Sequence, residues 1–182
     1  MRILATRHYP DAVEQRLTRD YNATLNPEDR YFKTKDLVGA SVDMGGLLIS
    51  PRETLDAECI NALPSSVRIL GTFSVGTNHI DIEAARQRGL IVTNVRGILA
   101  ETCADLAMML LLNAARRAFE GDQLVRTGAW TGWAPRQLLG IGFQGKRLGI
   151  LGMGQIGRAL AGRASAFGIS IHYCNRKRLS PD

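Results

Sequence analysis

Cysteine is scarce in this chain of 182 residues: three occur, at positions 59, 103 and 174. They are scattered, odd in number and form no CxxC pair, so we expect neither a disulfide framework nor a metal site. A cytoplasmic, reducing location follows as the natural expectation. Long apolar runs are also missing: the longest, residues 106–112, is far below the roughly 20 residues of a membrane span. The first residues hold enough apolar side chains for about one strand, which predicts no signal peptide.

The composition contains no low-complexity bias, because 45% of the residues are hydrophobic and 22% are charged, as in an ordinary globular protein. One number departs from the ordinary, a formal net charge of +6. Such a charge can indicate a polyanionic partner. The basic residues, however, are dispersed over the ends and sides of different predicted helices. They form no stripe or aromatic-interleaved groove, so we expect neither nucleic acid nor a membrane as partner.

The first ninety or so residues alternate apolar strands with amphipathic helices, which predicts a parallel sheet and an α/β fold. Ser50 and Glu53 form a capping-box pattern with proline between them, which predicts a helix over residues 51–61. Asp81 is expected to cap the helix 82–88, and Gly89 to end it in a left-handed conformation. The predicted strands are residues 2–6, 46–49, 67–71 and 91–93, with 23–25 as a further candidate, and the first helix is 11–17.

Residues 99–117 read as one long helix that is apolar on nearly every face. Such a helix is buried on nearly every face, so we expect it between domains or between subunits. Residues 119–146 read as loop with one short helix. The most regular unit follows: strand 147–151, helix 156–167, Gly168 and strand 169–173.

The turn between that strand and that helix carries the GxGxxG pattern at residues 152–157. Gly152 would permit the tight turn, Gly154 would let a pyrophosphate approach the backbone, and Gly157 would let helix and strand pack closely. The free amides of Gln155 and Ile156 would bind the phosphates, helped by the helix dipole. The pattern alone is weak, and a glycine-rich turn without a ligand is the alternative. Its place between a strand and a helix favours dinucleotide binding.

The residues after the second strand of this unit select the dinucleotide. An NAD site usually places a carboxylate there, about twenty residues beyond the glycines, to bind the ribose 2′-hydroxyl. This chain has Asn175, Arg176, Lys177 and Arg178 instead, and no carboxylate before Asp182. Because a guanidinium can bind a 2′-phosphate, we expect NADP(H) in preference to NAD(H). Arg176 would be the main contact and Asn175 and Lys177 would assist, the alternative being a solvated basic loop.

Several motifs in their usual order make the chain resemble the D-isomer-specific 2-hydroxyacid dehydrogenases, and within them the glyoxylate/hydroxypyruvate reductases. The resemblance covers the whole chain. The matching segments are SVGTNHID at 74–81, GLIVTN at 89–94, ETCADLA at 101–107, WTGWAP at 130–135 and GKRLGILGMGQIG at 145–157.

The resemblance implies a hydride transfer between a nicotinamide cofactor and a 2-oxo acid. Residues 1–98 would form a flavodoxin-like substrate-binding domain, and residues 99–182 the first part of a Rossmann dinucleotide-binding domain, with the active site between them. The family holds the substrate carboxylate on backbone amides that match Val75 and Gly76. A tryptophan that matches Trp133 reaches the neighbouring subunit's active site, although Trp133 could also pack within its own loop. Relatives dimerise through the helix that matches residues 101–117.

The resemblance also implies what this chain lacks. Family members use an arginine, an acid and a histidine for catalysis, and all three lie in the half of the nucleotide domain that follows this segment. Nothing in the sequence indicates that His8, His79 or His172 takes over one of these catalytic roles, so we assign no catalytic residue. The expectation is a fragment of an NADPH-dependent reductase of small 2-oxo acids. The alternatives are an inactive dinucleotide-binding remnant and a corepressor-type NAD(P) sensor.

Overall fold

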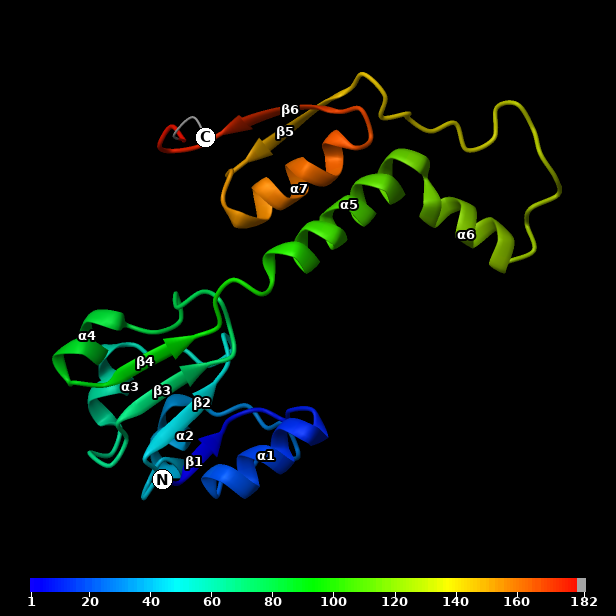
Figure 1. Cartoon of the computed structure of the whole chain (residues 1–182). Helices are drawn as coiled ribbons and strands as arrows, with labels where there is room; N and C mark the ends of the chain where they lie inside the picture. The colour runs from blue at the N-terminus through cyan, green and yellow to red at the C-terminus, as the bar shows by residue number, and fades with distance from the viewer. Residues whose placement is uncertain (180–182) are drawn as a thin grey trace. The chain divides into compact units, whose positions relative to one another are not determined.

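The computed structural model describes residues 1–179, and the chain divides into two compact units, Met1–Arg96 and Gly97–Asp182 (Figure 1). The division falls between Arg96 and Gly97, where the sequence predicted a boundary after residue 98. Each unit contains its own parallel sheet. The mixed α/β fold class predicted from the alternation of strands and helices is therefore confirmed.

The first unit is built on four parallel strands that lie side by side in chain order. An isolated parallel bridge between Leu4 and Thr24 adds a fifth segment at the free edge of the first strand. Counting that segment as the second strand gives the spatial order 2-1-3-4-5, which is the flavodoxin-like order. The candidate strand 23–25 is thus reduced to one bridge. The strands are β1 (Ile3–Ala5), β2 (Gly46–Ile49), β3 (Ile69–Thr72) and β4 (Ile91–Asn94).

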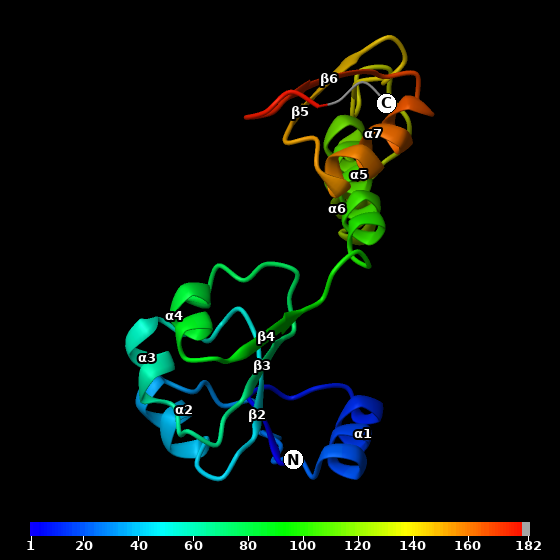
Figure 2. The same cartoon turned by 60° about the vertical axis from the view of Figure 1, so that its left-hand side comes forward.

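Helices cover both faces of this sheet. Figure 2 shows α1 (Asp11–Tyr21) on one face and α2 (Thr34–Ala40), α3 (Ala57–Ala62) and α4 (Ile82–Gln87) on the other. This division of the helices follows from right-handed crossovers. The chain passes from β1 to Thr24 toward one edge of the sheet and then from Thr24 to β2, β3 and β4 toward the other edge, so the connecting helices lie on opposite faces. The core consists of aliphatic side chains from the strands and the latter helices, among them Leu47, Leu70 and Ile60.

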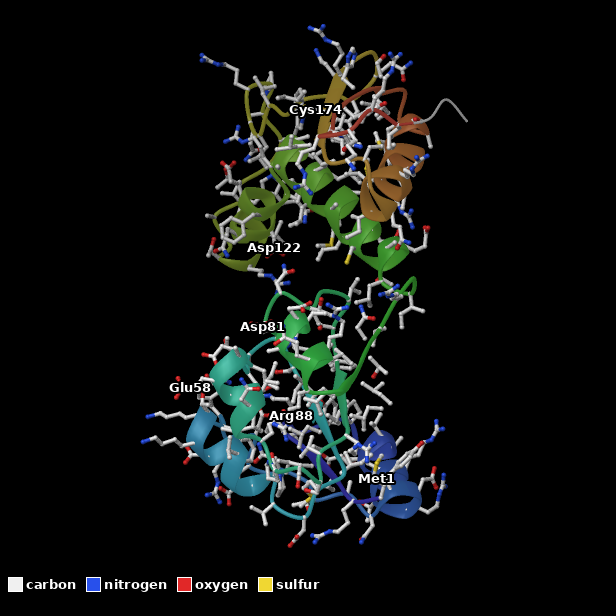
Figure 3. The ribbon with its side chains drawn as sticks, turned by 90° about the vertical axis from the view of Figure 1, so that its left-hand side faces the viewer. Met1, Glu58, Asp81, Arg88, Asp122 and Cys174 are labelled. Atoms are coloured by element: carbon white, nitrogen blue, oxygen red, sulfur yellow. The ribbon has the colours of Figure 1, made fainter. Side chains whose placement is uncertain are left out.

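Two helix ends in this unit were predicted from single residues. The Asp81 side chain accepts from the Ala84 amide at 2.9 Å and stands at the start of α4 (Figure 3). Gly89 has φ +75°, the left-handed conformation expected of a glycine that ends a helix. Both predictions are confirmed.

The helix predicted over residues 51–61 is wrong. The chain turns at residues 51–53 and pairs Leu55 with Ile80 in an isolated bridge, and α3 begins only at Ala57. Its cap is Asp56, whose side chain accepts from the Cys59 amide at 2.8 Å. Half of the capping box does form, because the Glu53 carboxylate accepts from the Ser50 amide at 2.9 Å. That contact stabilises a turn here and does not begin a helix.

The second unit contains α5 (Ala100–Arg116), α6 (Ala118–Arg126), β5 (Arg147–Leu151), α7 (Gln155–Ser165) and β6 (Ser170–Cys174). The two strands pair in parallel, and α5 and α7 pack together against the sheet (Figure 1). Met108, Ala164 and Ile169 form the centre of this small core. At its border Arg163 of α7 forms ion pairs with Asp105 and Glu101 of α5, at 2.6 and 2.8 Å.

Much apolar surface of this unit is exposed within residues 1–179. The sequence predicted α5 to be buried on nearly every face, but only Ala104 and Met108 are buried, and Leu106 and Leu110 are half-exposed. On the sheet, Leu151 is 89% exposed. The described part of the unit therefore does not cover its own apolar residues, as expected for a sheet that holds only the first two strands of a Rossmann domain.

Candidate functional site

The turn from β5 to α7 has the geometry that each fingerprint glycine was predicted to provide. Gly152 has φ +100°, a backbone conformation that residues with a Cβ atom rarely adopt. A Cβ on Gly157 would lie 2.3 Å from the Gly152 carbonyl oxygen, whereas a Cβ on Gly154 would meet nothing within 4 Å. Gly157 thus allows close packing against the turn, and Gly154 leaves the space in front of the helix open.

Gly154 is the N-cap residue of α7, so Gln155 and Ile156 are its first two helical residues. The first amides of a helix have no partner within the helix, and an eleven-residue helix adds its dipole. A phosphate group is the ligand that such an open turn binds. The residues present therefore fit a dinucleotide pyrophosphate.

Asn175 follows β6 and closes this turn from the other side. Its Oδ1 accepts from the Met153 amide at 2.7 Å, and the Gly152 amide donates to the Cys174 carbonyl at 2.9 Å. Asn175 was predicted to assist in binding a phosphate. The structure engages its carbonyl oxygen within the turn, which leaves the Nδ2 group for a ligand. Cys174, at the end of β6, is exposed (Figure 3), and Arg176 and Lys177 beyond it are exposed too.

A second group of backbone amides follows β3 in the first unit. We call residues 74–76 the amide loop. All three of its carbonyls accept hydrogen bonds: Ser74 from the Val95 amide at 2.9 Å, Val75 from Asn94 Nδ2 at 2.6 Å, and Gly76 from Ser74 Oγ at 2.6 Å. The first two donors lie at the end of β4. This loop is therefore held against the neighbouring strand through its carbonyls.

The amides of Val75 and Gly76 have no acceptor among residues 1–179. In a trans peptide the N–H points opposite to the C=O, so carbonyls tied to β4 turn the Val75 and Gly76 amides away from it. Both residues are exposed, and a hollow of about 420 Å³ lies beside them, lined by Pro51, Thr54, Ser74, Gly76, Asn78 and His79. Successive free amides of this kind can bind a carboxylate.

The remaining candidate residues are not brought into these sites by described contacts. Trp133 lies in the coil after α6 and is 83% exposed, so it is not packed within its own loop. His8 contacts Glu14 at 3.0 Å, and His172 is exposed on β6.

Sequence reasoning missed three residues at the amide loop: Asn94, Thr72 and His79. Thr72 and Asn94 lie just beyond the carboxyl ends of predicted strands, where α/β proteins bind ligands. His79 has no such position, and its sequence signal is its place in the segment 74–81 that carries the resemblance.

Comparisons with known proteins show the family of this chain. Residues 3–172 match the family model described as the D-isomer-specific 2-hydroxyacid dehydrogenase catalytic domain. The chain belongs to this family. It is 36% identical over 179 residues to a glycerate dehydrogenase from Hyphomicrobium methylovorum, covering 98% of the chain and 56% of that relative.

Solved structures share the fold of this chain. The TT0316 protein from Thermus thermophilus matches with a TM-score of 0.88 and 38% identity, over 98% of this chain and 57% of that one. An NADPH-dependent glyoxylate/hydroxypyruvate reductase from Sinorhizobium meliloti, in complex with citrate, matches with a TM-score of 0.82 and 31% identity, over 98% and 55%. The chain thus spans about half the length of the relatives it matches.

Residues 1–179 contain neither a membrane-spanning helix nor a cluster of metal-binding side chains. No helix there is long and apolar enough to cross a membrane. No three or more His, Cys, Asp or Glu side chains in that range gather as metal ligands would.

Proposed function

We propose that this chain is the N-terminal part of an NADPH-dependent reductase that converts small 2-oxo acids, such as glyoxylate and hydroxypyruvate, to 2-hydroxy acids. The arginine, acid and histidine of the family would lie in the remaining part of the protein, so this chain alone would be inactive. The observation that carries the proposal is the turn at residues 152–157, which joins a phosphate-binding geometry to a basic segment after β6.

The dinucleotide would be held by the second unit. The amides of Gln155 and Ile156 face no helical partner and would bind the pyrophosphate. Arg176, with Lys177 and the Asn175 Nδ2 group, would bind a 2′-phosphate, because no carboxylate follows β6 within residues 175–179 to repel it. When bound, NADPH supplies the hydride for the reduction.

The substrate carboxylate would be held by the amides of Val75 and Gly76 in the first unit. These two amides share peptide planes with the Ser74 and Val75 carbonyls, which accept from the Val95 amide and from Asn94 Nδ2, so both planes are fixed before a ligand arrives. Binding to a prepared site loses less conformational entropy than binding to a mobile one. The relatives named glyoxylate reductase and glycerate dehydrogenase support this class of substrate.

We also propose that the protein is a cytoplasmic homodimer formed through α5. The half-exposed Leu106, Met109 and Leu110 side chains on this helix support an apolar contact. By the resemblance, Trp133 would then reach the partner's active site, and its exposure leaves it free to do so.

NADPH and NADH titrations of the 182-residue chain, followed by nicotinamide fluorescence, test the cofactor assignment. We expect NADPH to bind more tightly, and Arg176→Ala to weaken NADPH by about 10- to 150-fold, the equivalent of one charge-assisted hydrogen bond of about 1.5–3 kcal/mol. Arg16→Ala, on exposed α1 surface, is the matched control. Equal affinity for NADH and NADPH would refute the role of Arg176.

Glyoxylate-dependent NADPH oxidation by the complete protein tests the reaction. Turnover by the complete protein and none by the 182-residue chain would support the proposal. NADPH binding without turnover in both forms would favour a sensor or a remnant instead.

A further inference from the structure

A chain of side-chain hydrogen bonds runs from His79 to the amide loop. His79 Nε2 lies 2.9 Å from Thr72 Oγ1, and Thr72 Oγ1 lies 2.8 Å from Ser74 Oγ. Ser74 Oγ in turn donates to the Gly76 carbonyl at 2.6 Å. Thr72 is the last residue of β3 and is buried. These hydrogen bonds thus link the carboxyl end of β3 to the last carbonyl of the amide loop.

The direction of every bond in this chain follows from proton counting. A hydroxyl has one proton to donate, and a carbonyl can only accept, so the Ser74 proton goes to Gly76. Ser74 Oγ must then accept from Thr72, which uses the single proton of Thr72. Thr72 Oγ1 must therefore accept from His79. His79 has to carry a proton on Nε2.

The rest of the structure holds His79 for this role. The Leu55 amide donates to the His79 carbonyl at 2.7 Å, within the bridge between Leu55 and Ile80. Partial burial lowers the pKa of His79, against an opposing effect of the Glu53 carboxylate. The ring is therefore neutral at neutral pH, where its two tautomers differ in which nitrogen donates.

We propose that His79 is a positioning residue of the amide loop: as the neutral Nε2–H tautomer it fixes Thr72 and Ser74 so that Ser74 holds the Gly76 carbonyl. This inference rests on the proposed function, in which the loop binds the substrate carboxylate. The Ser74 and Val75 carbonyls are tied to β4, but within residues 1–179 the Gly76 carbonyl accepts from Ser74 Oγ alone, a bond that fixes the peptide plane between Gly76 and Thr77 at the end of the loop. Without His79, the Thr72 hydroxyl can donate to another acceptor, and the Ser74 hydroxyl can then rotate away from the Gly76 carbonyl.

The tautomer can be read directly in the 182-residue chain by a long-range ¹H–¹⁵N correlation spectrum of the histidine rings. We expect His79 to be held as the Nε2–H tautomer, and Thr72→Val to weaken that preference to the level of an unrestrained ring while Thr72→Ser retains it. His172, exposed on β6, is the reference ring. A wild-type His79 protonated on Nδ1 alone would overturn the proposal.

Backbone amide resonances of the 182-residue chain test the conformation of the amide loop itself. His79→Leu should shift the backbone amide resonances of Gly76 and Thr77, and His79→Gln, which keeps a donor, should restore them. Thr6→Val is the matched control, because Thr6 is a buried threonine at the end of β1 whose hydroxyl donates to the Leu48 carbonyl, away from the loop. Loop resonances that do not move in His79→Leu would also overturn the proposal.

Kinetics of the complete protein with glyoxylate then test the consequence. His79→Leu should raise KM about two- to tenfold, as expected for one weakened hydrogen bond, with kcat unchanged because substrate binding alone is affected. His79→Gln should recover the KM, and Thr6→Val should leave it unaltered. A lowered kcat with constant KM would contradict a positioning role. If the wild type does not turn over glyoxylate, the proposed function fails, and the two spectroscopic results still decide the role of His79.

Discussion

Gly157→Ala tests the packing of the fingerprint turn most directly. The new Cβ would lie 2.3 Å from the Gly152 carbonyl oxygen and 3.3 Å from its carbonyl carbon. Both atoms belong to the backbone, and Gly152 is held at φ +100° with its amide bonded to the Cys174 carbonyl. Relief of the contact therefore requires α7 to move away from β5.

The size of the effect comes from two opposing terms. Replacing a helical glycine by alanine is worth about 1 kcal/mol in favour of the helix, and forcing an extra methyl group into packed backbone costs about 1–3 kcal/mol. Since the contact is with backbone, the upper part of that range applies, and we expect a net loss of about 1–2 kcal/mol in the free energy of unfolding.

Gly162→Ala, on the same helix, is the matched control. A Cβ there meets nothing within 4 Å, so only the helix-propensity term of about 1 kcal/mol remains and the variant should be stabilised. Hydrogen exchange at the β5 and β6 amides measures the stability of this unit separately from the first. Gly157→Ala and Gly162→Ala should change it in opposite directions, and an unchanged or increased stability in Gly157→Ala would refute the reasoning.

Three further predictions concern stability and thiol chemistry. Asp56→Ala removes the cap of α3 and should cost about 1 kcal/mol in chemical denaturation, whereas Asp56→Asn should cost little. Burial raises the pKa of the Cys59 thiol to about 11, and the Asp56 carboxylate adds to the shift. Because the thiol of the unfolded chain ionises at a lower pH, the free energy of unfolding should fall as the pH rises from about 9 to about 11. Cys59→Ala should flatten that fall. Arg163→Ala breaks the ion pairs with Asp105 and Glu101, whose side chains are exposed; the loss should stay below about 1 kcal/mol and shrink in high salt, and a loss that does not depend on salt would contradict this.

Local rules in the sequence predicted well wherever one residue decides the conformation. Asp81 and Gly89 define α4 because a side-chain cap and a left-handed glycine act within one turn of chain. Gly152 and Gly157 likewise act on the turn that they form. Such features need no knowledge of distant residues.

The failure at residues 51–61 arises from distant residues. Glu53 is 1% exposed and lies 3.8 Å from Arg7, which follows β1. The same carboxylate also accepts from the Ser50 amide and hydroxyl. This glutamate is therefore buried beside a cation that follows another strand, and the sequence around Ser50 and Glu53 does not show that contact. The helix α2 was missed for a simpler reason, since its seven residues carry no apolar period and no capping side chain.

The two candidate sites differ in predictability because they expose backbone amides by different means. In the β5–α7 turn the start of a helix leaves amides unpaired by its own geometry, and the glycine pattern that permits such a start is written in consecutive residues. The amide loop is followed by no helix until Ile82. The Val75 and Gly76 amides point away from β4 because Val95 and Asn94 engage the carbonyls of the same two peptide planes. Those partners come partly from another strand, so no local pattern marks them, and only the resemblance singled out Val75 and Gly76. We therefore expect Asn94→Ala, which frees the Val75 carbonyl, to change the orientation of the peptide plane that carries the Gly76 amide. A shift of the Gly76 backbone amide resonance would show this change.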